Sequence, residues 1–227
     1  MFLATLVFPQ FVTVSNLGRT DCVLSVITIL ILIILYYEKC ELLLPFLVTA
    51  AVCIHQGYVF LFFAIPVVIL LGRIMDAPRK RDVALLVSIV VPAAALFIYL
   101  NYMSQTVAAV HYDEINAVAA SLSADGSVHR ELMMHEVLGQ DPGADEWESH
   151  VVNFRELPLF SFFMLPYIIM LIAFFRACIG RTQGLCRVKY VMMSVGALST
   201  LPLFFFKLDY GRWVYAVIFY YIMIIMY

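Results

Sequence analysis

The stretch LLLPFLVTAAVCIHQGYVFLFFAIPVVILL, from Leu42 to Leu71, decides the fold of this chain. It is an apolar run of 30 residues, whereas about 20 are enough for a helix to cross the ~30 Å hydrocarbon core of a bilayer. His55, Gln56 and Gly57 interrupt the run near its middle. We expect either one steeply tilted helix or two short helices that meet at this polar break.

The whole 227-residue chain is strongly apolar: 64% of its residues are hydrophobic and 13% are charged. A soluble domain has about 45–50% apolar and about 25% charged residues. The 14 Lys and Arg residues are balanced by 16 Asp and Glu, so the basic surface of a nucleic-acid-binding domain is absent. The composition therefore excludes an ordinary soluble enzyme, a disordered chain and a nucleic-acid-binding domain. We predict an all-α fold, a polytopic membrane helix bundle with about seven to eight membrane segments.

The apolar segments fall into two groups separated by a polar loop. Residues 1–103 hold the first group, which includes a short-helix hairpin at 42–71. Residues 157–227 hold the second group, and residues 104–156 form the loop between them. The predicted membrane segments outside the hairpin are Phe2–Val14, Cys22–Tyr37, Val83–Met103, Leu157–Phe175, Val188–Phe206 and Trp213–Tyr227.

Basic residues near the helix ends predict which ends face the cytoplasm, where Lys and Arg are enriched. Arg73–Arg81 and Arg176–Lys189 each contain four basic residues, and we place both segments inside. The single lysine of the short turn Glu38–Glu41 places that turn inside as well. The Leu42–Leu71 run must then cross outward and return, with His55 at its outer end.

The loop at 104–156 is then extracytoplasmic, and it is too long to be only a connector. It contains 10 of the 16 acidic residues and four of the five histidines. His129 and His135 do not have the i, i+4 spacing of a helical zinc motif, and the cysteines form no CxxC pair, so we predict no metal and no other cofactor. Aliphatic residues at helical spacing predict an amphipathic helix on the membrane surface: Val107, Val110, Ile115, Val118 and Leu122.

The polar residues near the outer helix ends converge on one candidate site, because charge at membrane depth is costly and by default marks function. Arg19 has a guanidinium group, which binds phosphate oxygens bidentately. The neutral imidazole of His55 can serve as a general base near neutral pH. The full set is Arg19, Asp21, His55, Gln56, Lys207, Asp209 and Arg212.

These residues also have purely structural explanations, which stay open at this point. Asp21 can cap a helix beside a snorkelling Arg19. His55 can be a buried histidine that a backbone carbonyl satisfies, and the segment Lys207–Trp213 can be an interfacial anchor. If the three segments meet in space, that convergence supports a functional role for all three together.

The segment Asn16–Pro66 resembles the EpsG/Wzy-like polymerases of bacterial exopolysaccharides and O-antigens. The shared pattern is an Asn and an Arg that open a membrane helix, a short basic turn, and an apolar run interrupted by His and closed by aromatics and Pro. Here the pattern is Asn16-Leu-Gly-Arg19, Glu38-Lys39 and Ile54-His55-Gln56-Gly-Tyr-Val-Phe-Leu-Phe-Phe-Ala-Ile-Pro66. This chain departs from it at Thr20-Asp21 and at Gln56-Gly57.

The resemblance implies a polymerase-type glycosyltransferase that acts on polyprenyl-diphosphate-linked glycans at the outer face of the bacterial inner membrane. His55 would be the base for the acceptor hydroxyl, with Asp21 or Asp209 second. The substrate-binding residues would be Arg19, Gln56, Lys207 and Arg212. The partners would be membrane lipid and other polysaccharide-assembly proteins. The apolar C-terminal end and the single membrane segment before Arg19 predict a truncated member of the family.

Two other classes of protein remain open. A transporter or flippase subunit would use the same cations without chemistry, but it would carry polar residues at mid-membrane along a path. The predicted span Val83–Met103 contains no charged residue, which favours an enzyme at the interface. A non-catalytic assembly partner in a polysaccharide export system is the third class.

Overall fold

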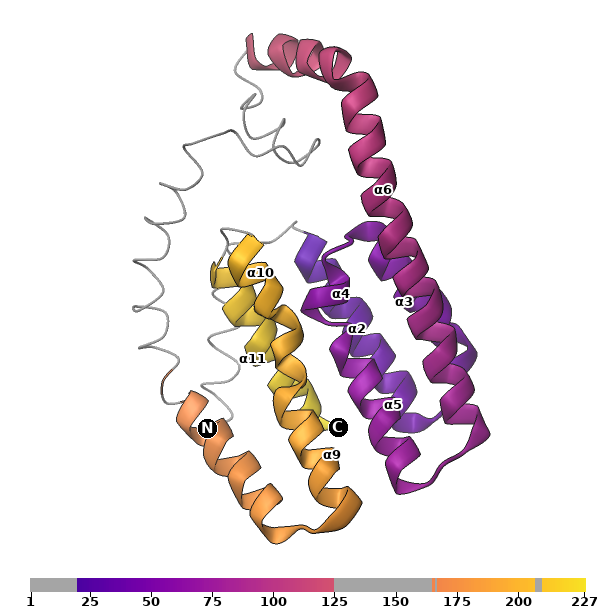
Figure 1. Ribbon diagram of the computed structural model, residues 1–227, viewed down its shortest axis with the longest axis vertical. Helices are drawn as coiled ribbons and strands as arrows, with labels where there is room; N and C mark the ends of the chain where they lie inside the picture. The colour runs from indigo at the N-terminus through magenta and orange to yellow at the C-terminus, as the bar shows by residue number, and fades with distance from the viewer. Residues whose placement is uncertain (1–19, 125–164, 166, 207–209) are drawn as a thin grey trace.

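The computed structural model describes residues 20–124, 165, 167–206 and 210–227, and this part of the chain is helical, without a strand. The helices before residue 124 and those after residue 167 form two groups that lie side by side (Figure 1). The all-α class predicted from the sequence is therefore confirmed. The predicted segment Phe2–Val14 and much of the loop at 104–156 lie outside the described residues.

The apolar run 42–71 forms two helices that run in opposite directions (Figure 1). Its elements are η1 (Glu41–Leu43), α3 (Leu44–Ile54), the single turn α4 (Tyr58–Leu61) and α5 (Ala64–Asp76). Pro45 and Pro66 lie in the first turns of α3 and α5, where a missing N–H breaks no helical hydrogen bond. Of the two arrangements that the sequence allows, the structure has the hairpin, with residues 55–57 at its bend.

Two long helices, α2 (Thr20–Tyr37) and α6 (Lys80–Ala124), pack against this hairpin. The Lys80–Met103 part of α6 is the one described helix that is long and apolar enough to cross a membrane, and it coincides with the predicted span Val83–Met103. Beyond Met103 the helix continues to Ala124, and its last part turns aside (Figure 1). Residues 104–124, expected to begin a separate loop, are thus a continuation of the same helix.

The C-terminal group consists of a helix at residues 167–181, α9 (Gly184–Val195), η2 (Gly196–Thr200), α10 (Leu201–Phe206) and α11 (Tyr210–Met226). Gly184 has φ +58°, a left-handed conformation that glycine adopts without strain, and it ends the short turn at 182–183. The basic segment 176–189, expected to be a loop, is therefore mostly helical. Its polar side chains are hydrated, but its backbone N–H and C=O groups form hydrogen bonds within the helices.

The helix α5 is at the centre of the bundle and contacts α2, α4, α6, α9 and α11. Its residues Ile65, Ile69 and Leu70 are buried. On the other side of the core, a Cβ atom at Gly196 would overlap the hydroxyl and ring of the buried Tyr220. η2 and α11 can therefore approach this closely only because residue 196 has no side chain.

The helix α2 is apolar on all sides, although protein covers only one of its faces. Leu24, Thr28, Ile31 and Leu35 form a buried stripe at helical spacing. A helix that is hydrophobic all round belongs in a core or in a membrane, and an uncovered apolar face marks an interaction with lipid or protein. The residues of the uncovered face are about half exposed: Val23, Val26, Leu30 and Ile33.

Candidate functional site

The bend of the hairpin presents several polar groups at the end of α3. His55 ends this helix in an extended conformation (φ −156°, ψ 115°), and its Nδ1 accepts a 2.9 Å hydrogen bond from the backbone N–H of Gly57. Oε1 of Gln56 is buried and has no hydrogen-bond partner among the described residues, whereas the fully buried Tyr58 hydroxyl lies against the side chain of Thr28 in α2. Because buried polar atoms are paired in nearly all native structures, Gln56 Oε1 makes the bend a candidate site.

The hydrogen bond from Gly57 also decides where the neutral His55 ring carries its proton. Since Nδ1 accepts this bond, the proton of the neutral imidazole lies on Nε2. Nε2 is then a hydrogen-bond donor, suited to an oxygen that gains negative charge. The sequence predicts His55 as the base, a role that needs a free lone pair on the ring, and in this tautomer the lone pair of Nδ1 accepts from Gly57 N–H.

Two further predicted segments begin at the same end of the bundle as this bend (Figure 1). Asp21 is the second residue of α2, and Arg212 is the third residue of α11. The Ser25 and Tyr215 hydroxyls, 3.3 Å apart, form a hydrogen bond between these two helices. Ser25 follows Asp21 by four residues and Tyr215 follows Arg212 by three, so positions 21 and 212 lie on the helix faces that meet here.

The structure thus brings four of the seven predicted positions to one end of the bundle. His55 and Gln56 lie at the bend, and α4, which follows the bend, contacts α11, near whose start residue 212 lies. The side chains of Asp21 and Arg212, and the whole of Arg19, Lys207 and Asp209, lie outside the described residues. Within the described ranges, no three His, Cys, Asp or Glu side chains gather as a metal site.

A charge cluster occupies the opposite end of the bundle, where Arg73 is the central residue. Its Nη1 donates to Glu41 Oε1 at 2.9 Å, its Nε donates to the Tyr227 hydroxyl at 2.8 Å, and its Nη2 donates to the carbonyl of Leu35. One guanidinium group therefore joins the C-terminal ends of α2, α5 and α11 to η1. The members of this cluster are Glu38, Glu41, Arg73, Arg79, Arg81 and Asp82.

The cluster has an exposed rim and a buried carboxylate. At the rim, Glu38 accepts hydrogen bonds from Arg79 at 3.0 Å and from Arg81 at 2.9 Å. The hydrogen bond from Arg79 is the main reason that the pKa of Glu38 lies below its usual value. Asp82 is fully buried, with Oδ1 3.7 Å from Arg73 Nη1 and Oδ2 3.9 Å from Arg79 Nε. Its position in the first turn of α6 favours the negative charge through the helix dipole.

The acidic and basic side chains of this cluster neutralise one another, so its role is to hold helix ends together rather than to bind a substrate. Lys189 pairs with Asp76 and brings the start of α9 to the same end. The turn at 38–41 and the two basic segments therefore lie at one end of the bundle, and the His55 bend lies at the other (Figure 1).

Two residues at the same end of the bundle as the His55 bend are missing from the predicted site. Tyr58 follows directly on the His55-Gln56-Gly57 break, and Tyr215 follows Arg212 by three residues. Both are tyrosines in apolar helices, and a tyrosine hydroxyl in such a place normally needs a partner. This was the signal by which the sequence could have identified them.

Comparisons with family models, with curated proteins and with solved structures find no match to this chain. Its function is therefore argued from its own residues and their geometry.

Proposed function

We propose that this protein is a polysaccharide polymerase of the EpsG/Wzy type, embedded in the bacterial inner membrane by several helices. The observation that carries the proposal is the convergence of three helix ends: the bend at 55–57, the start of α2 and the start of α11. Each of these brings a residue type that glycosyl transfer from a diphosphate requires. The substrate is a glycan linked to a polyprenyl diphosphate.

In this arrangement the charge cluster lies at the cytoplasmic side, where basic residues are enriched, and the His55 bend faces outward. The hairpin helices α3 and α5 have 11 and 13 residues, fewer than the about 20 that an upright crossing needs. With the cluster held at the inner interface, the bend lies below the outer surface of the bilayer. A lipid-linked substrate reaches such a recessed site laterally, from within the membrane.

The proposed reaction is attack of an acceptor sugar hydroxyl on the anomeric carbon of the lipid-linked glycan. Asp21, with Asp209 as the second candidate, takes the proton of the hydroxyl as the new C–O bond forms. The bond between the anomeric carbon and the diphosphate breaks, and the polyprenyl diphosphate leaves. His55 Nε2–H donates a hydrogen bond to an oxygen on which negative charge develops.

The other polar groups at this end of the bundle bind the substrate. Arg212 and Arg19, with Lys207, stabilise the negative charge of the leaving diphosphate. The unpaired Gln56 Oε1 suits the hydroxyl groups of a sugar, which both donate and accept hydrogen bonds.

The described helices give less support to a transport role. A transport path would need polar side chains at mid-membrane. In the described part of the chain, α3 has no charged residue, and α6 is uncharged from Val83 to Met103. The charged side chains of the charge cluster are instead paired with one another.

The test is the chain-length distribution of the glycan from cells that carry each variant in the full-length protein. His55→Ala should lower polymer formation by about 10²–10³-fold, the cost of losing one donor to developing negative charge. His55→Gln should retain part of the activity if Nε2 acts as a donor, because an amide also donates. Asp21→Asn and Arg212→Lys should both fail.

Lys80→Gln is the matched control, because Lys80 is exposed at the opposite end of the bundle. Its polymer should be normal. Normal polymer from both His55→Ala and Arg212→Lys would contradict the catalytic proposal and favour the assembly-partner class.

A further inference from the structure

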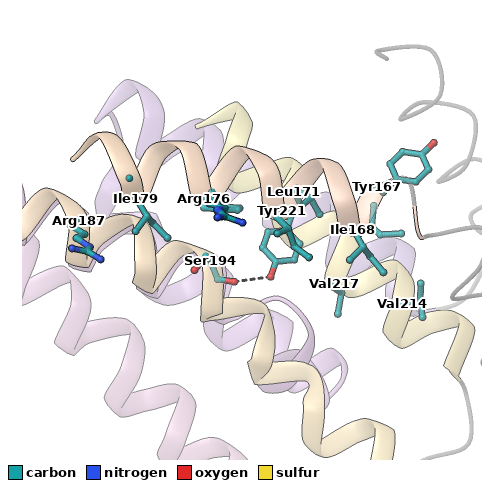
Figure 2. Close-up of a pocket in the computed structure, with 14 residues that line it drawn as sticks. Tyr167, Ile168, Leu171, Arg176, Ile179, Arg187, Ser194, Val214, Val217 and Tyr221 are labelled. Carbon is teal, nitrogen blue, oxygen red and sulfur yellow. Dashed lines mark hydrogen bonds between the residues drawn. The ribbon is translucent and has the colours of Figure 1, made fainter. Parts of the chain in front are cut away.

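A pocket of about 790 Å³ lies in the C-terminal group of helices, between residues 167–181, α9 and α11 (Figure 2). The helix at 167–181 supplies one wall, with Ile168, Leu171, Ile172 and Phe175. Ile172 is 60% exposed, so this wall continues onto the outer surface of the molecule. The pocket shares no lining residue with the His55 bend or with the charge cluster.

The floor of the pocket is apolar because its polar atoms are already satisfied. The hydroxyl of Tyr221 in α11 donates a 2.7 Å hydrogen bond to the carbonyl of Ser194 in α9 (Figure 2). The Tyr221 ring packs against Phe175, with 5.7 Å between the ring centroids. An apolar chain in this pocket would therefore leave no polar group of the floor unpaired.

Two arginines lie in the half of the pocket nearest the turn at 182–183. Arg176 comes from the helix at 167–181. Arg187 comes from α9, the helix on the other side of the pocket (Figure 2). Neither guanidinium forms an ion pair with a residue in the part of the chain that the structure describes, in contrast to the arginines of the charge cluster. The pocket thus combines an apolar body with two cations at one end.

We infer that this pocket binds one anionic phospholipid of the cytoplasmic leaflet. Its phosphate lies between Arg176 and Arg187, and one acyl chain lies along the wall from Phe175 to Ile168. Basic pockets between membrane helices on the cytoplasmic side bind anionic headgroups, and guanidinium groups match phosphate oxygens. The inference rests on the membrane placement in the proposed function, but not on its chemistry.

The length of the pocket agrees with a lipid from a single leaflet. Tyr167 and Gly180 both line it, and they are 13 residues apart on one helix, or about 20 Å at 1.5 Å per residue. One leaflet contributes about half of the ~30 Å hydrocarbon core. An acyl chain together with its phosphate therefore fits the wall from the arginines to Tyr167.

The test measures lipid binding to the purified full chain in detergent, with native mass spectrometry as the readout. Phosphatidylglycerol should bind with one tight site, and phosphatidylcholine should bind more weakly. The variant R176Q/R187Q should weaken phosphatidylglycerol binding by roughly 30-fold. Arg181→Gln is the matched control, since Arg181 is on the same helix and exposed but does not line the pocket. An equal loss from Arg181→Gln would overturn the inference by showing unspecific attraction to the surface.

A second measurement tests the apolar wall. Ile172→Asn should weaken binding of both lipids, and a photo-crosslinking residue at position 172 should capture lipid in membranes. Because Ile172 is largely exposed, neither change disturbs the core. Capture of another part of this chain, or of a second copy, would overturn the inference.

These outcomes are independent of the polymerase proposal. His55→Ala should leave lipid binding unchanged even where polymer is lost. If R176Q/R187Q bound phosphatidylglycerol as tightly as the natural protein while His55→Ala lost polymer, the lipid pocket alone would be refuted. If R176Q/R187Q lost lipid binding while His55→Ala made normal polymer, the polymerase proposal alone would be refuted.

Discussion

The guanidinium of Arg73 lies 2.9 Å from the carboxylate of Glu41, and the two side chains are only 10% and 7% exposed. Glu41 directly precedes the apolar run 42–71, and Arg73 follows it by two residues. The ion pair therefore joins the two ends of the hairpin, and this holds the His55 bend at the opposite end of the bundle.

Loss of either partner should destabilise the protein strongly. Arg73→Met should lower the free energy of unfolding by about 3–5 kcal/mol, because the fully buried Asp82 would keep only Arg79, 3.9 Å away, and Glu41 would keep only Arg81. Glu41→Gln should also be destabilising, although Arg73 keeps Asp82 as a partner. The measurement is unfolding in mixed micelles. Glu38→Gln is the control: Glu38 is 39% exposed and pairs only with Arg79 and Arg81, which are 52% and 49% exposed, so this change should cost about 0–1 kcal/mol.

The double variant R73M/E41L distinguishes the charge effect from a general packing defect. An apolar pair of similar volume should recover the part of the loss that comes from the Arg73–Glu41 pair, because replacement of a buried ion pair by apolar residues is often neutral, while the buried Asp82 keeps only Arg79 as a partner. If the double variant were as unstable as the sum of its single changes, the ion pair would not explain the loss.

The ion pairs at the rim of the charge cluster predict that the stability of the folded protein falls at acidic pH. The pKa of Glu38 in the folded protein lies below its ordinary value of 4.5, chiefly because Arg79 donates a hydrogen bond to the carboxylate. Its stabilising contribution is therefore present at neutral pH and is lost as the pH falls through the lowered pKa. Thermal unfolding between pH 7 and pH 3 should show a steeper loss for the natural protein than for Glu38→Gln. High salt should reduce the difference, and parallel curves would contradict the assignment.

Much of the architecture could be predicted from the sequence because hydropathy reports directly on it. The break at His55-Gln56-Gly57 correctly located the bend, and the basic segments correctly shared one end of the bundle. The predicted span ends at Met103, where hydropathy falls, whereas the helix continues without a break through the predicted amphipathic residues to Ala124. A change to polar side chains alters the surroundings of a helix without interrupting its backbone hydrogen bonds.

The candidate site could be predicted only in part, because its decisive contacts are formed by the tertiary structure or by local backbone geometry. The hydrogen bond between Ser25 and Tyr215 joins residues that are 190 positions apart, and no pattern in the sequence connects them. The proton position on His55 depends on the Gly57 N–H, whose direction follows from the backbone conformation at the bend.

Two engineered cysteines test which side of the membrane each end of the bundle occupies. In a chain without its native cysteines, a cysteine at Ser123 should react with an impermeant thiol reagent added from outside. A cysteine at Ala77 should react only after permeabilisation, because the apolar part of α6 separates the two positions. The reverse labelling would place the His55 bend in the cytoplasm and contradict the proposed mechanism.

The contact between Gly196 and Tyr220 predicts the cost of a single methyl group. In Gly196→Ala the new Cβ would overlap the buried Tyr220, whose hydroxyl donates to the Met193 carbonyl at 2.9 Å. The ring or the backbone must move, and overpacking of this kind costs about 1–3 kcal/mol. Gly180→Ala is the control, because no atom lies within 4 Å of its added Cβ. That change should stabilise its helix by about 0.5–1 kcal/mol.

A smaller residue at position 220 should relieve this clash. Tyr220→Leu alone loses the hydrogen bond to Met193 and part of the packing, so it is destabilising by itself. In G196A/Y220L the methyl group enters the space that the ring leaves, and the combined loss in free energy of unfolding should be smaller than the sum of the single losses. Strict additivity of the two changes would show that η2 and α11 do not pack against each other through these residues.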